Sequence, residues 1–257
     1  MRSRLRAALV LVLTAGLLAY FLRNADMAGV WAETRHADAG LLVVVLLLTG
    51  MTYGLRAYRW QYLLAPIGPT HFTTAFETTV IGFAASFLLP ARAGEVLRPY
   101  LLARRERLPA TAAFATVILE RALDTATVLL LFGVFVLFIT PDALTADARL
   151  YAQVKTGGAL AGAAAVAGLG VFFVLAGHPE RLGRAALRIE RILPARLARI
   201  VATFVETFVQ GLAVMRQPRR LAVSLALSFP LWMSIAAGIW LTSRAFHMTF
   251  SYLGSFL

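Results

Sequence analysis

Long runs without charged residues alternate with short arginine-rich segments along this chain. Five such runs contain a single charged residue between them, Asp124. They cover residues 7–22, 39–55, 122–140, 156–177 and 221–243. Because about 20 apolar helical residues cross the hydrocarbon core of a bilayer, the pattern predicts five full spans. We therefore expect an all-α, polytopic membrane protein with one domain over residues 1–257.

The first run has a second interpretation as a cleaved signal peptide. Its basic start, with Arg2, Arg4 and Arg6, is typical of one. The first small-x-small site, Ala37 and Ala39, lies well downstream, which favours a retained helix.

Arginines between the runs predict the orientation. With a cytoplasmic N-terminus, the inside segments carry 19 basic residues and the outside segments carry five. Positive residues collect in cytoplasmic loops, so we expect a plasma membrane protein with its N-terminus inside. Amphipathic residues 181–193 place arginines along one face, which predicts contact with anionic lipid at the cytoplasmic surface.

Two further apolar segments, Phe72–Leu89 and Ile200–Met215, have arginines on both sides. Both ends of each segment therefore belong inside, and we expect each segment to enter the membrane and return as a re-entrant hairpin. Residues 77–82 and 206–211 match at four of six positions. This match indicates either a parallel repeat of units at about 39–140 and 156–243, as in some transporters, or chance.

Composition excludes several classes of protein. The chain is 60% hydrophobic and 15% charged, too apolar for a soluble domain. Its net charge of +12 comes with no nucleic-acid-binding motif, so no nucleic acid partner is expected. Cysteine is absent, and no metal or cofactor motif is present. Four aromatic residues are typical of an interfacial belt: Tyr53, Tyr58, Trp60 and Tyr62.

The densest polar stretch is residues 89–99. Pro90 and Gly94 break a helix there, and Arg92, Glu95 and Arg98 supply two cations and an anion. Because guanidinium groups bind phosphate with two hydrogen bonds, these three residues are a candidate site for a lipid head group. The alternative is a solvated surface turn.

A second cluster, Glu120, Arg121 and Asp124, lies within an apolar stretch. Arg121 and Asp124 can pair, whereas Glu120 and Asp124 repel unless one is protonated or a cation bridges them. Ionisable residues inside a membrane are functional candidates, although a structural tie is the other interpretation. Glu77 and Glu206, the hairpin acids, either face a common cavity or tie down their own hairpins.

These motifs carry a family resemblance. Arg56-x-x-Arg59-Trp60, then Leu89-Pro90-Ala91-Arg92-Ala93-Gly94-Glu95, then Glu120-Arg121-x-x-Asp124 resemble the transmembrane region of lysylphosphatidylglycerol synthases and their flippase-like relatives. The resemblance implies a protein that moves a charged or glycosylated lipid head group between leaflets. No soluble aminoacyl-transferase domain follows, and the chain stops before the family's further spans, which predicts a truncated member without lipid-lysylating activity.

Two other functions stay open at this stage. The chain could be a non-transporting subunit of a lipid-modifying complex, or a membrane-embedded transferase whose carboxylates do acid–base chemistry. Isolated histidines and the absence of a Gly-x-Ser-x-Gly motif favour a non-enzyme. The expected partners are a membrane phospholipid or glycolipid and, for assembly, a second copy of the chain.

Overall fold

The structure is a computed structural model. It describes residues 26–138, 148–176, 207–208 and 211–248, together with positions 12, 16–17, 19–20 and 22–23. Every regular element in these ranges is a helix, which confirms the all-α class. The elements are α2 (Met27–His36), α3 (Ala39–Leu64), α4 (Phe72–Leu88), η1 (Pro90–Arg92), α5 (Gly94–Glu106), α6 (Ala110–Phe138), α8 (Ala148–Ala176), η2 (Ala213–Arg216) and α11 (Pro218–Ala245).

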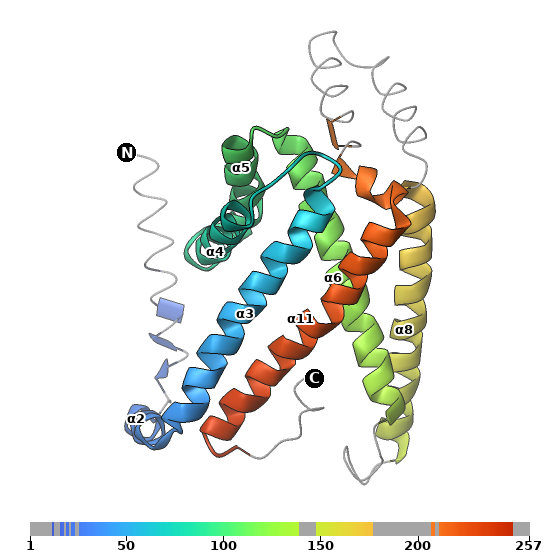
Figure 1. The fold of residues 1–257 in the computed structure, drawn as a ribbon. Coiled ribbons are helices and arrows are strands. Elements are labelled where there is room, and N and C mark those ends of the chain that lie inside the picture. Colours follow the sequence, from blue (N-terminus) through green and yellow to red (C-terminus); the bar gives the residue numbers. More distant parts are fainter. Residues whose placement is uncertain are drawn as a thin grey trace.

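Four long helices, α3, α6, α8 and α11, run the length of the molecule (Figure 1). α3 packs along α11, and α6 packs along α8. Each long helix has 26 to 29 residues, which is roughly 40 Å of helix at 1.5 Å per residue. This length exceeds the thickness of a bilayer core of about 30 Å.

Two of these helices, α3 and α11, are long and apolar enough to cross a membrane. The four long helices correspond to the second to fifth predicted runs, whereas most of the first run and residues 181–193 lie outside the described residues. The total of five spans, the cytoplasmic N-terminus and the internal repeat therefore stay predictions.

The first hairpin differs from its predicted position. Residues 72–88 do not enter and return; they form one unbroken helix, α4. The chain reverses after it, at Pro90 and at Ala91 and Arg92, whose φ angles are positive at 56° and 52°. α5 is the returning limb and packs along α4. The turn lies here because Pro90 cannot continue a helix. Most of the second predicted hairpin, Ile200–Met215, lies outside the described residues.

Close packing of the α4–α5 hairpin depends on two glycines. A Cβ atom on Gly94 would overlap the Gly82 carbonyl oxygen and the Ser86 side chain. A Cβ atom on Gly82 would lie 2.7 Å from the Cβ atom of Arg98. Glycine at both positions lets the limbs approach and brings Arg98 toward the interior.

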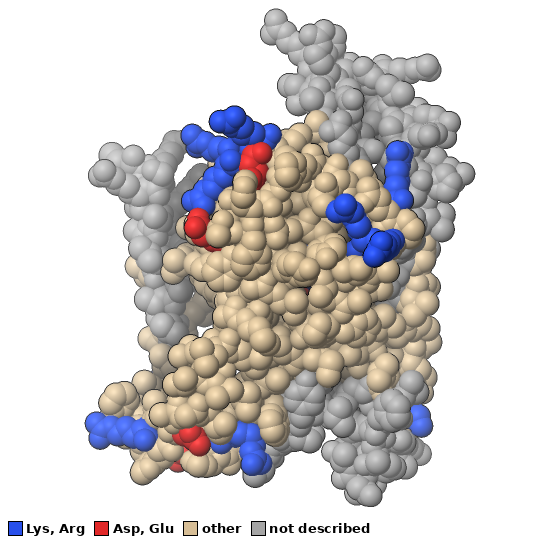
Figure 2. All heavy atoms as spheres, viewed as in Figure 1, with Lys and Arg blue, Asp and Glu red and all other residues tan. Residues whose placement is uncertain are grey.

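The molecule has charged ends and an apolar middle. Figure 2 shows lysines, arginines and acids gathered at two opposite ends of this face, with other residues between them. At one end, the backbone N–H of Asp38 donates to the carbonyl of Ala245 at 2.9 Å, which joins the start of α3 to the end of α11. This distribution is expected of a protein with an apolar belt in lipid.

Candidate functional site

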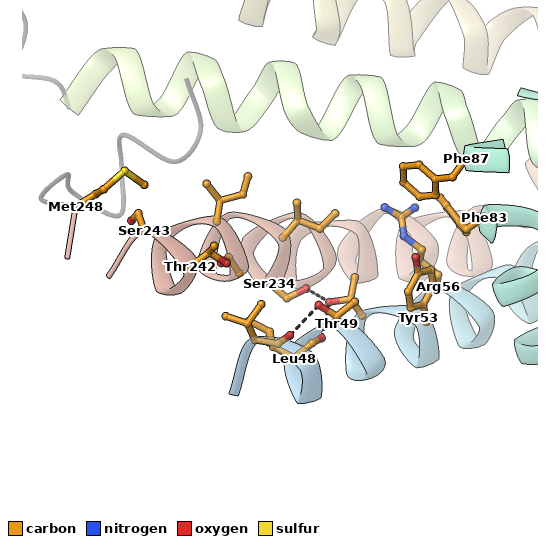
Figure 3. Close-up of a pocket in the computed structure, with 15 residues that line it drawn as sticks. Leu48, Thr49, Tyr53, Arg56, Phe83, Phe87, Ser234, Thr242, Ser243 and Met248 are labelled. Carbon is orange, nitrogen blue, oxygen red and sulfur yellow. Dashed lines mark hydrogen bonds between the residues drawn. The ribbon is translucent and has the colours of Figure 1, made fainter. Parts of the chain in front are cut away.

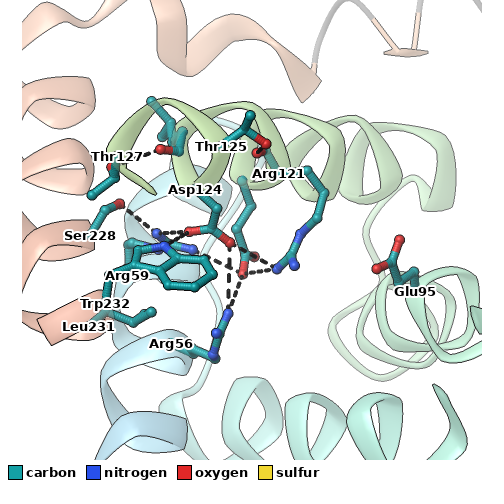
Figure 4. A network of polar contacts seen from close by, with 12 residues as sticks. Arg56, Arg59, Glu95, Arg121, Asp124, Thr125, Thr127, Ser228, Leu231 and Trp232 are labelled. Carbon is teal, nitrogen blue, oxygen red and sulfur yellow. Dashed lines mark hydrogen bonds and ion pairs between the residues drawn. The ribbon is translucent and has the colours of Figure 1, made fainter. Parts of the chain in front are cut away.

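The most polar part of the interior is a cluster of ion pairs between α3, α5 and α6 (Figure 4). We call it the ion cluster; its members are Arg56, Arg59, Arg98, Glu120, Arg121 and Asp124. Glu120 is fully buried and has four guanidinium groups within 4.0 Å. Asp124 has three, at 2.6, 3.2 and 3.8 Å. The predicted charge cluster on α6 is therefore one half of a larger assembly.

One sequence expectation for these acids is confirmed, and a second question about them is answered by the geometry. Arg121 pairs with Asp124, three residues later, at 3.2 Å. Of the ways to relieve repulsion between Glu120 and Asp124, the structure shows bridging cations, because Arg59 contacts both carboxylates at 3.1 and 2.6 Å. Four arginines thus face two carboxylates, which leaves two positive charges in excess.

This excess charge is incompletely bonded. Nitrogen atoms of all four arginines lack a hydrogen-bond partner among the described residues. The atoms are Nη1 of Arg56, Nε of Arg59, Nε and Nη2 of Arg98, and Nε of Arg121; Nη2 of Arg59 has its ion pair with Glu120 at 3.1 Å. Burying unpaired charge costs several kcal/mol per ion. A bound anion would offset this cost.

Trp60 supports the ion cluster from α3. Its ring lies 3.9 Å below the guanidinium carbon of Arg98, and its Nε1–H donates to Thr116 at 2.9 Å. Trp60 is fully buried, so its assignment to an interfacial aromatic belt is wrong. Both ends of the indole find partners in the interior, which explains why the ring lies there.

α11 contributes two further polar contacts to the cluster. Ser228 accepts a hydrogen bond from Arg59 at 2.5 Å, and Trp232 Nε1–H donates to Asp124 at 3.3 Å. Both contacts fix the orientation of groups that also make ion pairs. Three long helices are therefore joined at this point.

A cavity of about 340 Å³ lies between the α4–α5 hairpin and α6. We call it the first cavity. Arg92, Glu95 and Arg98, the predicted head-group residues, all line it, together with Arg121 and Trp232. Its size is in the usual range for ligand pockets. The sequence-predicted binding residues and one member of the α6 cluster thus share a single chamber.

The lining charges differ in how open they are. The side chain of Arg92 is 80% exposed and lies 3.8 Å from Glu95, which is 40% exposed. Arg121 is 35% exposed, whereas Arg98 is buried against Glu120 at 3.0 Å. Arg92 and Glu95 therefore lie at the mouth of the first cavity, Arg121 lies within it, and Arg98 forms part of its buried wall.

A larger cavity of about 540 Å³ runs between α3 and α11 (Figure 3). We call it the second cavity. Arg56 and Phe83 lie at one end and Met248 at the other. The ion cluster thus borders both cavities.

Glu77, the first of the two hairpin acids, does not line either cavity. Glu77 is exposed and pairs with Arg105 of α5 at 2.5 Å, the geometry of a tie between the hairpin limbs. Glu206 lies outside the described residues.

Arg56 and Arg59 are the site residues that the charge pattern did not single out. We counted both as cytoplasmic loop charges, but they are buried in α3. Their spacing of three residues is a usable signal, because it places both on one helix face, as Arg121 and Asp124 are on α6. The family motif also contained them.

The fold and the site define a helical membrane protein with a buried, positively charged cluster. Residues 7–257 match the family described as the lysylphosphatidylglycerol synthase TM region, and the chain belongs to that family. This confirms the resemblance seen in the motifs.

Two curated proteins are similar over part of the chain. A UPF0104 membrane protein of Methanocaldococcus jannaschii is 29% identical over 99 residues, which are 37% of this chain and 29% of that protein. The glycosyltransferase AglD of Haloferax volcanii is 29% identical over 126 residues, 48% of this chain and 20% of that protein. The matches therefore span less than a third of either relative. No solved structure matches the chain.

Proposed function

We propose that this protein binds the phosphate of a membrane lipid head group in the first cavity and moves the head group between leaflets. The observation that carries the proposal is the excess of two positive charges in the ion cluster. Arg121, a partly exposed member of this cluster, lines the first cavity. At an effective dielectric constant of 20, opposite unit charges about 4 Å apart attract by roughly 4 kcal/mol. A phosphate satisfies both the charge and the free N–H groups.

Each lining residue has a separate role in this proposal. Arg92 meets the phosphate at the mouth, Arg121 holds it inside, and Arg98 adds positive charge from behind. Glu95 accepts hydrogen bonds from hydroxyl or ammonium groups of the head group. A charged or glycosylated lipid fits this set of donors and acceptors, and the lipid named in the family's description supports such a ligand.

Acid–base catalysis is less well supported by the same geometry. Each carboxylate of the ion cluster faces three or more guanidinium groups. These ion pairs occupy both carboxylates, whereas a general acid or base needs an oxygen atom that can reach a proton of the substrate. The name of the Haloferax relative favours a glycolipid as the cargo, and its activity as a whole is not carried over to this chain.

Leaflet exchange of fluorescent phosphatidylglycerol in proteoliposomes tests the proposal. We expect the wild type to exceed protein-free vesicles and Arg121→Gln to lose about tenfold, which corresponds to about 1.4 kcal/mol. Arg105→Gln is the matched control, because Arg105 is an exposed arginine of the hairpin. Equal rates for wild type and Arg121→Gln would refute the proposal. A modified lipid formed from an added donor substrate would favour a transferase instead.

A further inference from the structure

The second cavity meets the ion cluster at Arg56. Arg56 is the member of the cluster that lines this cavity, whereas Arg98 and Arg121 line the first. Figure 3 shows its guanidinium group at the end of the chamber, beside Phe83 and Phe87. The cluster therefore offers a different cation to each cavity.

Arg56 is also the most weakly bound of the four arginines. Its Nη1 atom lies 3.8 Å from Asp124 and 4.0 Å from Glu120, beyond hydrogen-bond distance. Arg59, by contrast, reaches the same carboxylates at 2.6 and 3.1 Å. Arg56 is only 7% exposed, and its Nη1 has no hydrogen-bond partner among the described residues. Arg56 can therefore bind an additional anion without breaking a short ion pair.

Phe83 separates the two cavities. Its ring lines both of them, lies 5.0 Å from the guanidinium carbon of Arg56 and packs edge-on against Tyr53 at 5.4 Å. Phe87 also lines both cavities but is mostly exposed. Phe83 and Phe87 are the lining residues that the two cavities share, and the ring of Phe83 lies beside Arg56.

The second cavity offers acceptors for a polar head group. Hydroxyl side chains line it from both helices: Thr49, Thr52, Ser234, Thr242 and Ser243. Thr49, Thr242 and Ser243 each donate to a backbone carbonyl of their own helix, whereas the hydroxyl groups of Thr52 and Ser234 lie 2.9 Å apart and share a hydrogen bond between α3 and α11. Their oxygen atoms can still accept hydrogen bonds, so they suit glycerol or sugar hydroxyl groups better than phosphate.

We propose that Arg56 is a second binding station for the lipid phosphate, facing the second cavity and reached from the first cavity past Phe83. This inference rests on the proposed function and adds the next position of the head group. From Arg56 the cavity follows α3 back to Val45, eleven residues or roughly 16 Å of helix. That distance is about half of a bilayer core.

Cysteine protection tests the station without measuring transport. The chain has no cysteine of its own, so one introduced thiol reports one place. Thr49→Cys reports the second cavity and Ser86→Cys the first. Phosphatidylglycerol in micelles is the probe; diacylglycerol with the same chains and inorganic phosphate are the comparisons.

We expect phosphatidylglycerol to slow thiol modification at both positions by about tenfold, and diacylglycerol to slow neither. Adding Arg56→Gln should remove protection at position 49 and leave protection at position 86. If Arg56→Gln fails to fold, Arg56→Lys takes its place, because it retains the positive charge. Because lysine lacks the planar fork, this variant should weaken protection at position 49 alone.

The contrary results are separable. Protection at position 86 without protection at position 49 overturns the station and leaves the proposed function standing. Lipid protection at neither position overturns both. Protection at position 49 that survives Arg56→Gln, or that inorganic phosphate reproduces in full, also overturns the station, because the lipid phosphate would then not be held by Arg56.

If the ring of Phe83 obstructs passage between the cavities, Phe83→Ala should speed exchange of fluorescent phosphatidylglycerol several-fold over wild type. Phe72→Ala is the control, since Phe72 is an exposed residue of the same helix. A rate for Phe83→Ala equal to that of Phe72→Ala would contradict the role of the ring.

Discussion

The pair formed by Arg59 and Asp124 provides a quantitative test of the ion cluster. Their atoms Nη1 and Oδ1 lie 2.6 Å apart, both side chains are buried, and each has other partners in the cluster. Removing one partner of a buried pair leaves an uncompensated charge and costs about 3–5 kcal/mol. We therefore expect Asp124→Asn, which raises the excess in the ion cluster to three positive charges, to lower the free energy of unfolding by that amount. Arg59→Met, which reduces the excess to one because Asp124 keeps Arg121 and Arg56, should lower it by less.

The double variant should lose less than the sum of the single losses, because no buried charge is left without its main partner. We expect an interaction energy of about 1–3 kcal/mol, measured by reversible unfolding in mixed micelles. Glu77→Gln is the control; its pair with Arg105 is exposed, so the loss should be below about 1 kcal/mol. Additivity within about 0.5 kcal/mol would refute the reasoning.

Two further predictions concern the hairpin. Gly82→Ala should displace Arg98 and lower leaflet exchange. Gly50→Ala has open space around it, so it should stabilise α3 by up to about 1 kcal/mol without lowering leaflet exchange. Equal rates of leaflet exchange in the two variants would contradict this packing. Burial raises the pKa of Glu106. Hydrogen bonds, one of them from His71, lower this pKa by more than burial raises it, so the pKa of Glu106 lies below its ordinary value. The stability that this group contributes is present above its ordinary pKa and is lost as the pH falls through the lowered value. The melting temperature of Glu106→Gln should therefore fall less than that of the wild type as the pH is lowered into the acid range. An equal fall in both proteins would contradict this prediction.

The charge pattern predicted the long helices well because membrane spans are set by length and polarity. It placed the hairpin turn wrongly, since the arginine count located both ends of Phe72–Leu89 on one side but could not say which residues formed the return limb. Pro90 and Gly94 marked the break, and α5 was too polar to stand out as a partner of α4.

The site was predicted in part for a related reason. Glu120, Arg121 and Asp124 stood out because they interrupt an apolar stretch, whereas Arg56 and Arg59 lie near the end of one and resemble loop charges. Which cations meet which acids depends on how α3, α5 and α6 pack, and that is long-range information. Periodicity along a single helix does not contain it.

The most direct test of the central claim is an experimental structure of the protein in phosphatidylglycerol nanodiscs. If the ion cluster binds lipid phosphate, the phosphate oxygens should lie about 2.7–2.9 Å from guanidinium nitrogens of Arg121 or Arg56, with the lipid tails reaching into the bilayer. Phosphates found only at the bilayer surface, with acyl chains filling both cavities, would contradict the claim.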